Sequence, residues 1–319
     1  MLKATSIAGQ FLQENFWLAK STRDTIKRAI DYFVLANGNR EIDRIVPSDG
    51  ENYKGWLLKT GRSKTTANIY LRAVNRVLNW SVETKLLIKA NPLRKCRQFR
   101  LTRNPVIIYD DSQIERMLRF CPSLRWEGII MAAYTTGLRR GAILNLNRDN
   151  IRNGFIFVEP KKNTKYTWEW SPKDKEIRKV PMIDQLKDII NQLNGFYPFI
   201  TLRRYDRMIH LNGIGLLSEY ARKCPDQNFR RTFVKIQRRA FGRQIGDFHR
   251  FRKNFTTMMC EELPAHFAMR LTGHNDLKTM TYYLACRESY YDKAREIATE
   301  GIKIGPLATR EARLRKKVC

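Results

Sequence analysis

Three basic side chains and a pair of tyrosines lie close together in one stretch of the sequence, from His249 to Tyr283. His249 and Arg252 are three residues apart, so on a helix they lie on one face and can point at one anion. His274, Tyr282 and Tyr283 follow. A guanidinium offers a planar fork of donors and an imidazole can donate or accept a proton, so a phosphate is the natural occupant. The cluster suits the opening of a phosphodiester by a side-chain nucleophile, although a lone His-x-x-Arg is more often an ordinary pair on a helix surface.

The composition of the chain points to the same class of substrate. The sequence holds 60 Lys and Arg residues against 31 Asp and Glu residues, a formal net charge of +29. Such an excess favours a polyanion partner, because like charges otherwise repel one another within the compact state. The uncharged run at 189–202 is too short to span a bilayer, and the N-terminus lacks the apolar region of a signal peptide. Nucleic acid is therefore favoured over membrane.

The six cysteines are scattered without a C-x-x-C pair. This spacing predicts reduced thiols in a cytoplasmic protein, with neither a disulfide framework nor a zinc site.

The length of 319 residues predicts roughly two domains. A Pro-interrupted basic stretch between Asn91 and Pro105 marks the boundary. We expect a helical DNA-binding domain at residues 1–95, a linker at 96–109 and a second domain at 110–319. The apolar residues of one N-terminal helix recur at helical spacing and form a stripe, namely Ala67, Tyr70, Leu71, Val74, Leu78 and Val82.

The second domain is predicted to begin with a helix that Ser112 caps, with Glu115 completing a capping box. A buried helix then ends at Gly137, which we expect in the left-handed conformation. Arg139 and Arg140 follow at once. An arginine just beyond a buried helix is held rigidly and can enter a site, although a cation there also stabilises the helix dipole without any ligand.

A short β region comes next, with strands expected at 154–158, 165–170 and 176–182. The fold class is therefore mostly α with a small antiparallel sheet. A turn lysine can reach over a neighbouring site and protonate a leaving oxygen. The lysines of these turns are Lys161, Lys162, Lys165, Lys173 and Lys175.

The order of these motifs resembles that of the tyrosine recombinases, also called the phage integrase family, over nearly the whole chain. The segment T-T-G-L-R-R-G is similar to the family's box around its first arginine, Arg139. His249-x-x-Arg252, L-T-G-His274 and Tyr283 then follow in the family's order, with Tyr283 nine residues after His274. The N-terminal helices resemble the core-binding domain of the same family.

The resemblance implies a role for each of these residues. Arg139 and Arg252 would clamp the scissile phosphate, and His274 would donate a further hydrogen bond to it. His249 would accept the proton of the attacking phenol, and Tyr283 would be the nucleophile. The product would be a 3′-phosphotyrosyl link with a free 5′-hydroxyl, formed without metal or ATP.

Two of these assignments have an alternative in the sequence, and one further position departs from the family's pattern. Tyr282 and Tyr283 point about 100° apart on a helix, so only one can reach the phosphate, and the spacing favours Tyr283. Lys173 is preferred as the general acid over Lys162, with residues 161–170 interpreted as an added excursion of the hairpin. Ala142 stands where the family commonly has an acidic residue, and its presence leaves Arg139 without that buttress.

The resemblance further implies two domains that close around double-stranded DNA. Four copies of the chain would exchange strands on paired sites through a Holliday junction, and the protein would act on a mobile element or chromosome in the cytoplasm, at the nucleoid. Two alternatives are a type IB topoisomerase, which relaxes supercoils without paired sites, and a non-catalytic DNA-binding relative, which the alanine at 142 favours.

Overall fold

The chain divides into two compact units, Met1–Asn104 and Pro105–Cys319. The division falls inside the stretch at 96–109 that the sequence predicts as a linker. Each unit is described here by itself. The computed structural model describes residues 2–85, 87–102, 105–173, 177–273, 276–281 and 283–284.

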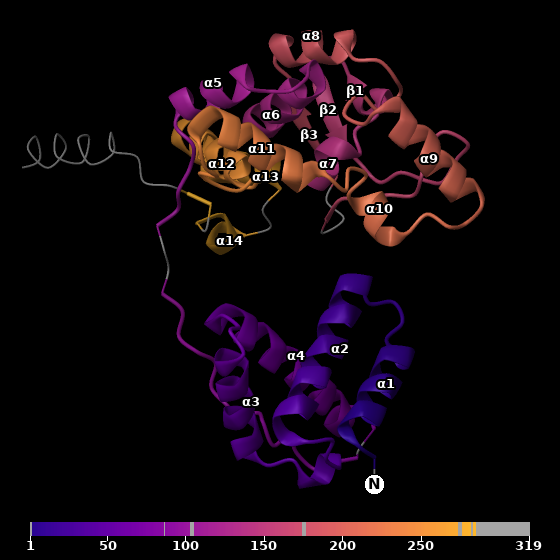
Figure 1. Cartoon of the computed structure of the whole chain (residues 1–319), viewed down its shortest axis with the longest axis vertical. Helices are drawn as coiled ribbons and strands as arrows, with labels where there is room; N and C mark the ends of the chain where they lie inside the picture. Colours follow the sequence, from indigo (N-terminus) through magenta and orange to yellow (C-terminus); the bar gives the residue numbers. More distant parts are fainter. Residues whose placement is uncertain are drawn as a thin grey trace, which may run out of the picture. The chain divides into compact units, whose positions relative to one another are not determined.

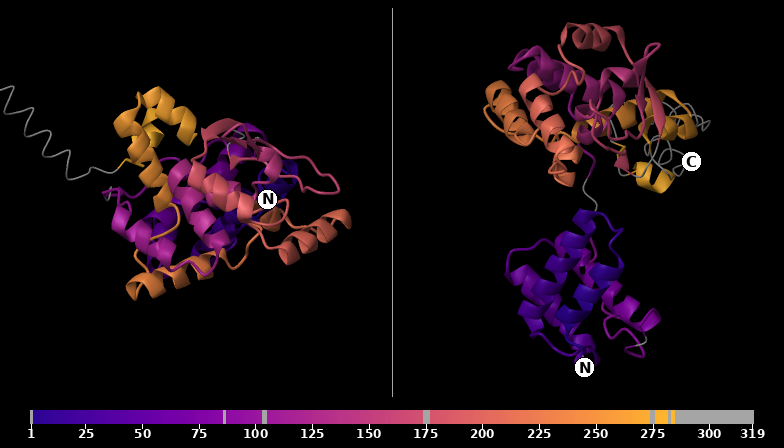
Figure 2. Two further views of the ribbon diagram at one scale, coloured as in Figure 1. Left: turned by 90° about the horizontal axis from the view of Figure 1, so that it is seen from above. Right: turned by 90° about the vertical axis from the view of Figure 1, so that its right-hand side faces the viewer.

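The N-terminal unit is a bundle of four α-helices in which α2 packs against the other three (Figure 1, Figure 2). Ser63 caps α4, because its hydroxyl oxygen accepts a hydrogen bond from the Thr66 N–H at 3.1 Å. The predicted apolar stripe of α4 is buried, apart from the half-buried Val82. The helices of this unit are α1 (Ala4–Glu14), α2 (Lys20–Asn37), the 3-10 helix η1 (Ile42–Arg44), α3 (Pro47–Lys59) and α4 (Lys64–Glu83).

The segment that leaves the bundle is fastened to it as far as Phe99. The side-chain amide of Asn68 on α4 bonds both backbone groups of Phe99, at 2.8 and 2.9 Å. At the other end of the linker, the amide of Asn254 bonds both backbone groups of Tyr109 in the second unit. The connection between these anchors is therefore shorter than the linker predicted at 96–109.

In the second unit, helices pack around a small antiparallel sheet (Figure 1, Figure 2). The strand order is β1-β2-β3, and Ile156 of β2 pairs with Ile151 of β1 and Val180 of β3. The predicted fold class, mostly α with a small antiparallel sheet, is confirmed. The strands are β1 (Ile151–Arg152), β2 (Phe155–Val158) and β3 (Arg178–Pro181). The helices are α5 (Asp111–Arg119), α6 (Leu124–Thr136), α7 (Arg140–Leu144), the 3-10 helix η2 (Arg148–Asn150), α8 (Asp184–Gln192), α9 (Leu202–Gly213), α10 (Glu219–Lys223), α11 (Phe229–Phe241), α12 (Arg250–Glu262), α13 (Ala265–Thr272) and α14 (Leu277–Thr281).

Helix α6 is the buried helix that the sequence predicts, and it packs against α12. Gly137 ends α6 with φ +61°, in the left-handed region, as predicted. A Cβ atom at this position would lie only 2.4 Å from the ring of Phe255 on α12. Glycine therefore serves both the turn and the close approach of the two helices.

Two local predictions were wrong. Helix α5 is capped by Asp110, whose carboxylate accepts from the Gln113 N–H at 2.8 Å, while Ser112 only donates to that carboxylate. The run at 165–170 forms no strand ladder, because several of its backbone N–H groups bond nearby side chains and Trp170 forms only an isolated bridge to Lys161. Thr167 donates to the hydroxyl of Thr164, and Glu169 donates to the side chain of Asn163.

Within the described part of the chain, no helix combines the length and hydropathy needed to cross a bilayer.

Candidate active site

One cavity in the second unit, of about 550 Å³, collects residues from distant parts of the chain. Arg139, Lys173, His249, Arg252 and Tyr283 all line it. Five of the six residues predicted to do the chemistry therefore line the same cavity. The sixth, His274, and the alternative tyrosine, Tyr282, lie outside the described residues.

Arg252 is the most buried of these groups, with 1% of its surface exposed. Its two Nη atoms donate to backbone carbonyls at the ends of α6 and α13, namely Gly137 at 2.9 Å, Thr272, and Gly273 at 3.3 Å. The Nε atom is buried and has no hydrogen-bond partner among the described residues. A buried cation with a donor left over favours an anion beside it, because a negatively charged acceptor offsets the cost of burying the charge.

Two further cations, Arg139 and Arg178, lie close to Arg252. Burial, and then the positive charges of Arg139 and Arg178, lower the pKa of Arg252. The fork of a guanidinium keeps its proton in proteins nonetheless, so these three like charges repel one another in the absence of an anion. A bound phosphate would relieve that repulsion.

His249 and Tyr283 meet at the same cavity. Their ring centroids lie 5.3 Å apart with the planes inclined at 66°. The guanidinium of Arg252 lies 5.6 Å from the centroid of the tyrosine ring. The backbone of Tyr283 is held from two sides, since its N–H donates to the Met280 carbonyl at 2.8 Å and its carbonyl accepts from the Thr257 hydroxyl at 3.3 Å.

The imidazole of His249 is uncharged at neutral pH. The side chain keeps an exposed edge, but partial burial, followed by the charge of Arg252, lowers the pKa of His249 to about 4. Asp247 opposes this shift only in part. His249 can therefore accept a proton at neutral pH, which a histidine already protonated could not do.

Arg139 enters the cavity from the N-terminal end of α7. Its carbonyl accepts from the N–H groups of Ala142 and Ile143, at 2.8 and 3.1 Å, so the residue is the N-cap of the helix. Ala142, where the sequence analysis expected the loss of an acidic buttress, is buried with 7% of its surface exposed. Its methyl group offers Arg139 no acceptor.

Of the two lysines weighed as general acid, Lys173 lines the cavity and Lys162 does not. The difference arises because Lys161 and Trp170 pair as an antiparallel bridge, with N–H···O distances of 2.7 and 3.1 Å. The bridge closes residues 161–170 into a loop of their own and returns the chain to the cavity only at Lys173.

Arg178 was missed by the sequence analysis. It lies on β3, it is 9% exposed, and its charge acts on Arg252. The alternation of the strand carried the signal, since Arg178 and Val180 are both buried while Lys179 and Pro181 are exposed. Placing Val180 inward places Arg178 inward as well.

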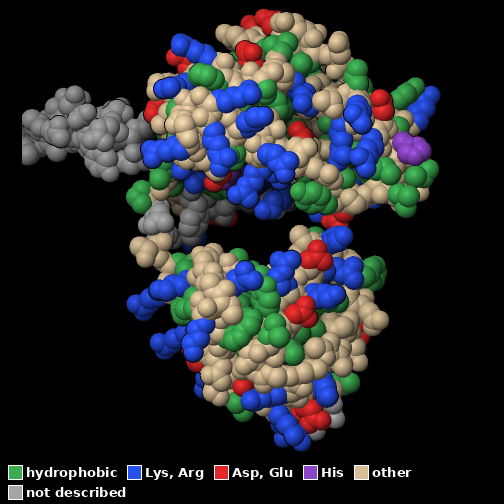
Figure 3. Space-filling model, viewed as in Figure 1, with side chains coloured by type: hydrophobic (Ala, Val, Ile, Leu, Met, Phe, Trp, Pro, Cys, Tyr) green, Lys and Arg blue, Asp and Glu red, His purple; other side chains and the backbone are tan. Residues whose placement is uncertain are grey.

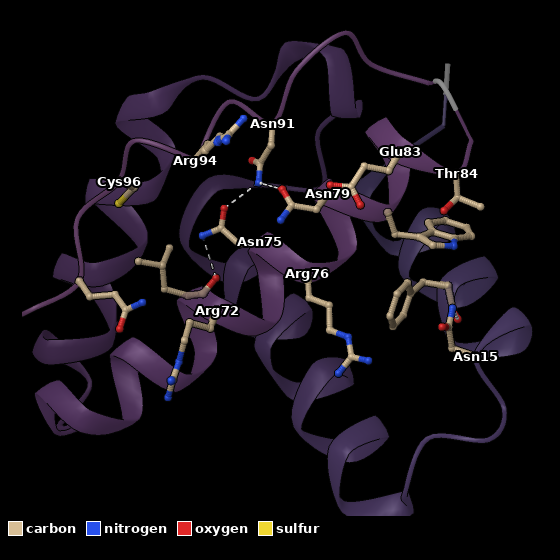
Figure 4. A pocket seen from close by; sticks show the side chains of 14 residues that line it. Asn15, Arg72, Asn75, Arg76, Asn79, Glu83, Thr84, Asn91, Arg94 and Cys96 are labelled. Atoms are coloured by element: carbon tan, nitrogen blue, oxygen red, sulfur yellow. Dashed lines mark hydrogen bonds between the residues drawn. The ribbon is translucent and has the colours of Figure 1, made fainter. Parts of the chain in front are cut away.

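The N-terminal unit has a cavity of its own, of about 600 Å³, along α4 (Figure 4). The amide of Asn91 donates to the side-chain oxygens of Asn75 and Asn79 at 2.8 and 2.7 Å and fixes the chain that follows α4. Arg72 and Arg76 lie on the same wall with exposed side chains. On the face of each unit visible in Figure 3, Lys and Arg side chains outnumber those of Asp and Glu.

Comparison with known proteins is consistent with this geometry. The sequence model described as "Phage integrase family" matches residues 108–289, more than half of the chain. No curated protein matches the chain.

Several solved structures share the fold. The Tn1549 transposon integrase in complex with a circular intermediate DNA is 17% identical, with a TM-score of 0.69 over 94% of this chain and 100% of that one. A lambda integrase dimer bound to a COC′ core site is 13% identical, with a TM-score of 0.65 over 86% of this chain and 96% of that one. A lambda integrase tetramer bound to a Holliday junction is 12% identical, with a TM-score of 0.68 over 89% of this chain and 77% of that one. The motifs, the fold and the family match agree, and the chain belongs to the phage integrase family of tyrosine recombinases.

Proposed function

We propose that the protein is a site-specific DNA recombinase that cleaves and rejoins DNA strands through a phosphotyrosyl link at Tyr283. One observation carries the proposal, the convergence of Arg139, Lys173, His249, Arg252 and Tyr283 on a single cavity. A tyrosine beside a neutral histidine and two arginines is equipped for attack on a phosphodiester.

The arginines would hold the scissile phosphate. Arg252 is fixed by carbonyls on two sides and keeps the Nε donor for a non-bridging oxygen. Arg139 would hold a second oxygen from the end of α7. Donors that are fixed in place before the reaction stabilise the extra negative charge of the pentavalent transition state without reorganisation. His274 is proposed to add a further donor to the same phosphate, as the family resemblance implies.

The proton balance of the cleavage step follows from the same residues. The phenol oxygen of Tyr283 forms a bond to phosphorus while its proton passes to His249. The bond from phosphorus to the 5′-oxygen breaks, and Lys173 supplies the proton to that leaving oxygen. The products are a 3′-phosphotyrosine and a 5′-hydroxyl, and attack by another 5′-hydroxyl reverses the step. The phosphodiester energy is conserved in the link, so neither metal nor ATP is required.

We further propose that the two units bind opposite faces of double-stranded DNA and that four copies act on paired sites through a Holliday junction. The excess of 60 basic over 31 acidic residues supports binding to the DNA backbone. The solved relatives support the assembly, since one is an integrase on a circular intermediate DNA and another is a tetramer on a Holliday junction.

The test uses nicked duplexes tiled across the DNA that flanks the gene, in which cleavage releases a short strand and traps the covalent adduct. We expect the wild type to form an adduct that survives denaturing electrophoresis. Tyr283→Phe should form none while it binds the same DNA, and the neighbouring Tyr282→Phe is the matched control that should react. Paired sites on one plasmid should then give recombinants.

Other outcomes decide against the proposal in distinct ways. An adduct that persists in Tyr283→Phe and vanishes in Tyr282→Phe would show that Tyr282 is the nucleophile. Relaxation of any plasmid without recombinants would identify a type IB topoisomerase instead. DNA binding without an adduct on any tile would identify a non-catalytic relative.

A further inference from the structure

Helix α7, which begins directly after its N-cap Arg139, has only five residues. A helix of this length has no stability of its own, because its few hydrogen bonds do not offset the cost of nucleation. Its direction, and with it the position of Arg139, must therefore come from tertiary contacts. Gly141 lies against α10 so closely that a Cβ atom there would be 2.9 Å from the Lys223 carbonyl.

Asn145 holds the other end of α7. It is the C-cap of the helix and only 1% exposed. Its side-chain N–H groups donate to the carbonyls of Gly141, at 2.8 Å, and Arg222, at 3.0 Å. One amide thus joins the last turn of α7 to α10 across a long separation in the sequence.

The excursion at 161–170 supplies the remaining partners of Asn145. The indole N–H of Trp168 donates to the side-chain oxygen of Asn145 at 2.9 Å, and the ammonium of Lys161 donates to its backbone carbonyl. Both donors are themselves fixed by Tyr197. The Trp168 ring is fully buried and stacks on the tyrosine with centroids 4.4 Å apart, and the Lys161 ammonium lies 4.6 Å from the same ring.

These contacts satisfy every polar group of Asn145, the residue that ends the helix. Asn145 uses both amide hydrogens and its side-chain oxygen, and the excursion closes on itself through the Lys161–Trp170 bridge. A fully satisfied buried polar network fixes one arrangement, because any rotation of the helix would leave a buried donor or acceptor without a partner.

We propose that the excursion at 161–170 is a brace that positions Arg139 for phosphate binding, by holding Asn145 at the far end of α7 through Trp168 and Lys161. Asn145, Trp168 and Lys161 are positioning residues, since none of them lines the cavity. The inference rests on the proposed function and assigns a task to a loop that the cleavage chemistry does not use.

The test is single-turnover cleavage of the nicked duplex with protein in excess. Trp168→Phe keeps a ring to stack on Tyr197 but removes the N–H donor to Asn145. The matched control is Trp170→Phe, in the same loop, because the Trp170 side chain is also buried and its indole makes no hydrogen bond within the described residues. We expect Trp168→Phe to lower the rate constant of adduct formation about tenfold, and Trp170→Phe to change it less than about twofold.

Three readouts separate positioning from loss of folded protein. At saturating protein, partial unfolding leaves the rate constant of adduct formation unchanged, whereas a misplaced Arg139 lowers it. Binding to intact DNA should not change. In an Arg139→Lys background the tenfold effect of Trp168→Phe should shrink below about twofold. The reason is that a residue acting through Arg139 has little to position once the guanidinium has been replaced.

Two results would contradict the brace. An unchanged rate in Trp168→Phe, or an undiminished tenfold effect in the Arg139→Lys background, overturns the brace. If Trp168→Phe does not fold, Lys161→Met carries the same test, since it keeps an apolar stem against Tyr197 and removes the donor. Failure of the proposed function is distinguishable, because the wild type itself would then form no adduct.

Discussion

The imidazole of His249 and the phenol of Tyr283 meet edge to face, with ring centroids 5.3 Å apart. The histidine stands at the start of α12, and the tyrosine follows α14. Because the backbone of Tyr283 is bonded to Thr257 on α12, both rings are placed by the same helix. The pairing of the proposed nucleophile with its proposed proton acceptor is thus built into one element of the fold.

The protonation state of His249 can be measured directly. Burial and the charge of Arg252 lower the pKa of His249 to about 4, so its imidazole resonance should not titrate near the ordinary value of about 6.5. Histidine NMR of the protein, with His249→Gln to assign the signal, checks this. A midpoint near 6.5 would contradict the lowered pKa of His249.

The same shift predicts a dependence of stability on pH. The unfolded state binds more protons than the folded state between the folded pKa of about 4 and the unfolded pKa of about 6.5. Stability should therefore fall as the pH falls through this window, with no contribution above it. His249→Gln should be less sensitive to acid there than the wild type, as measured by urea unfolding at matched pH values.

Lys173 is expected to protonate the leaving 5′-oxygen. Lys173→Ala should slow cleavage of ordinary DNA by about 10²-fold, the usual contribution of a general acid. A substrate with sulfur in place of the bridging 5′-oxygen has a leaving group that needs no proton, so the same variant should cleave it at nearly the wild-type rate. Lys162→Ala is the control and should behave as wild type on both substrates. If Lys162→Ala instead cleaves ordinary DNA slowly and the sulfur substrate normally, Lys162 is the general acid.

Arg252 is expected to support both the chemistry and the fold. Arg252→Lys keeps a positive charge but loses the planar fork, so we expect cleavage to slow by about 10²-fold or more. The carbonyls of Gly137 and Thr272 lose a donor at the same time, which should lower the free energy of unfolding by about 1–3 kcal/mol.

Arg250→Lys is the control for this experiment. Arg250 lies on the same helix but outside the cavity, where it packs over the ring of Tyr109. Adduct formation and urea unfolding measure the two effects. Normal cleavage by Arg252→Lys would remove this residue from the phosphate site.

The N-terminal unit is expected to contribute phosphate contacts through Arg72 and Arg76, whose side chains are exposed on α4. Replacing both by Gln should weaken DNA binding most at low salt and reduce the slope of log K against log salt by about 2. Lys59→Gln on α3 is the control from the same unit. Affinity titrations at several salt concentrations measure the slope, and an unchanged slope would place the DNA on another face.

The sequence was sufficient for the features that depend on local order. Helical spacing identified the stripe of α4 and the buried helix that ends at Gly137, because periodicity and φ preferences act between near neighbours. Alternation located β2 and β3 but also suggested a strand at 165–170, where side-chain bonds from Thr164 and Asn163 take the backbone donors instead. Short-range patterns do not reveal such competition.

For the candidate site, the sequence by itself determined which residue types are present and in what order: Arg139, then a hairpin lysine, His249, Arg252 and Tyr283. Only the tertiary structure decided that the excursion closes at Lys161 and Trp170, so that Lys173 lines the cavity, that Arg178 is buried near Arg252, and that His249 is neutral. The reason is physical. Burial, desolvation and the field of distant charges depend on distances through space, which the fold sets between residues that the chain keeps far apart.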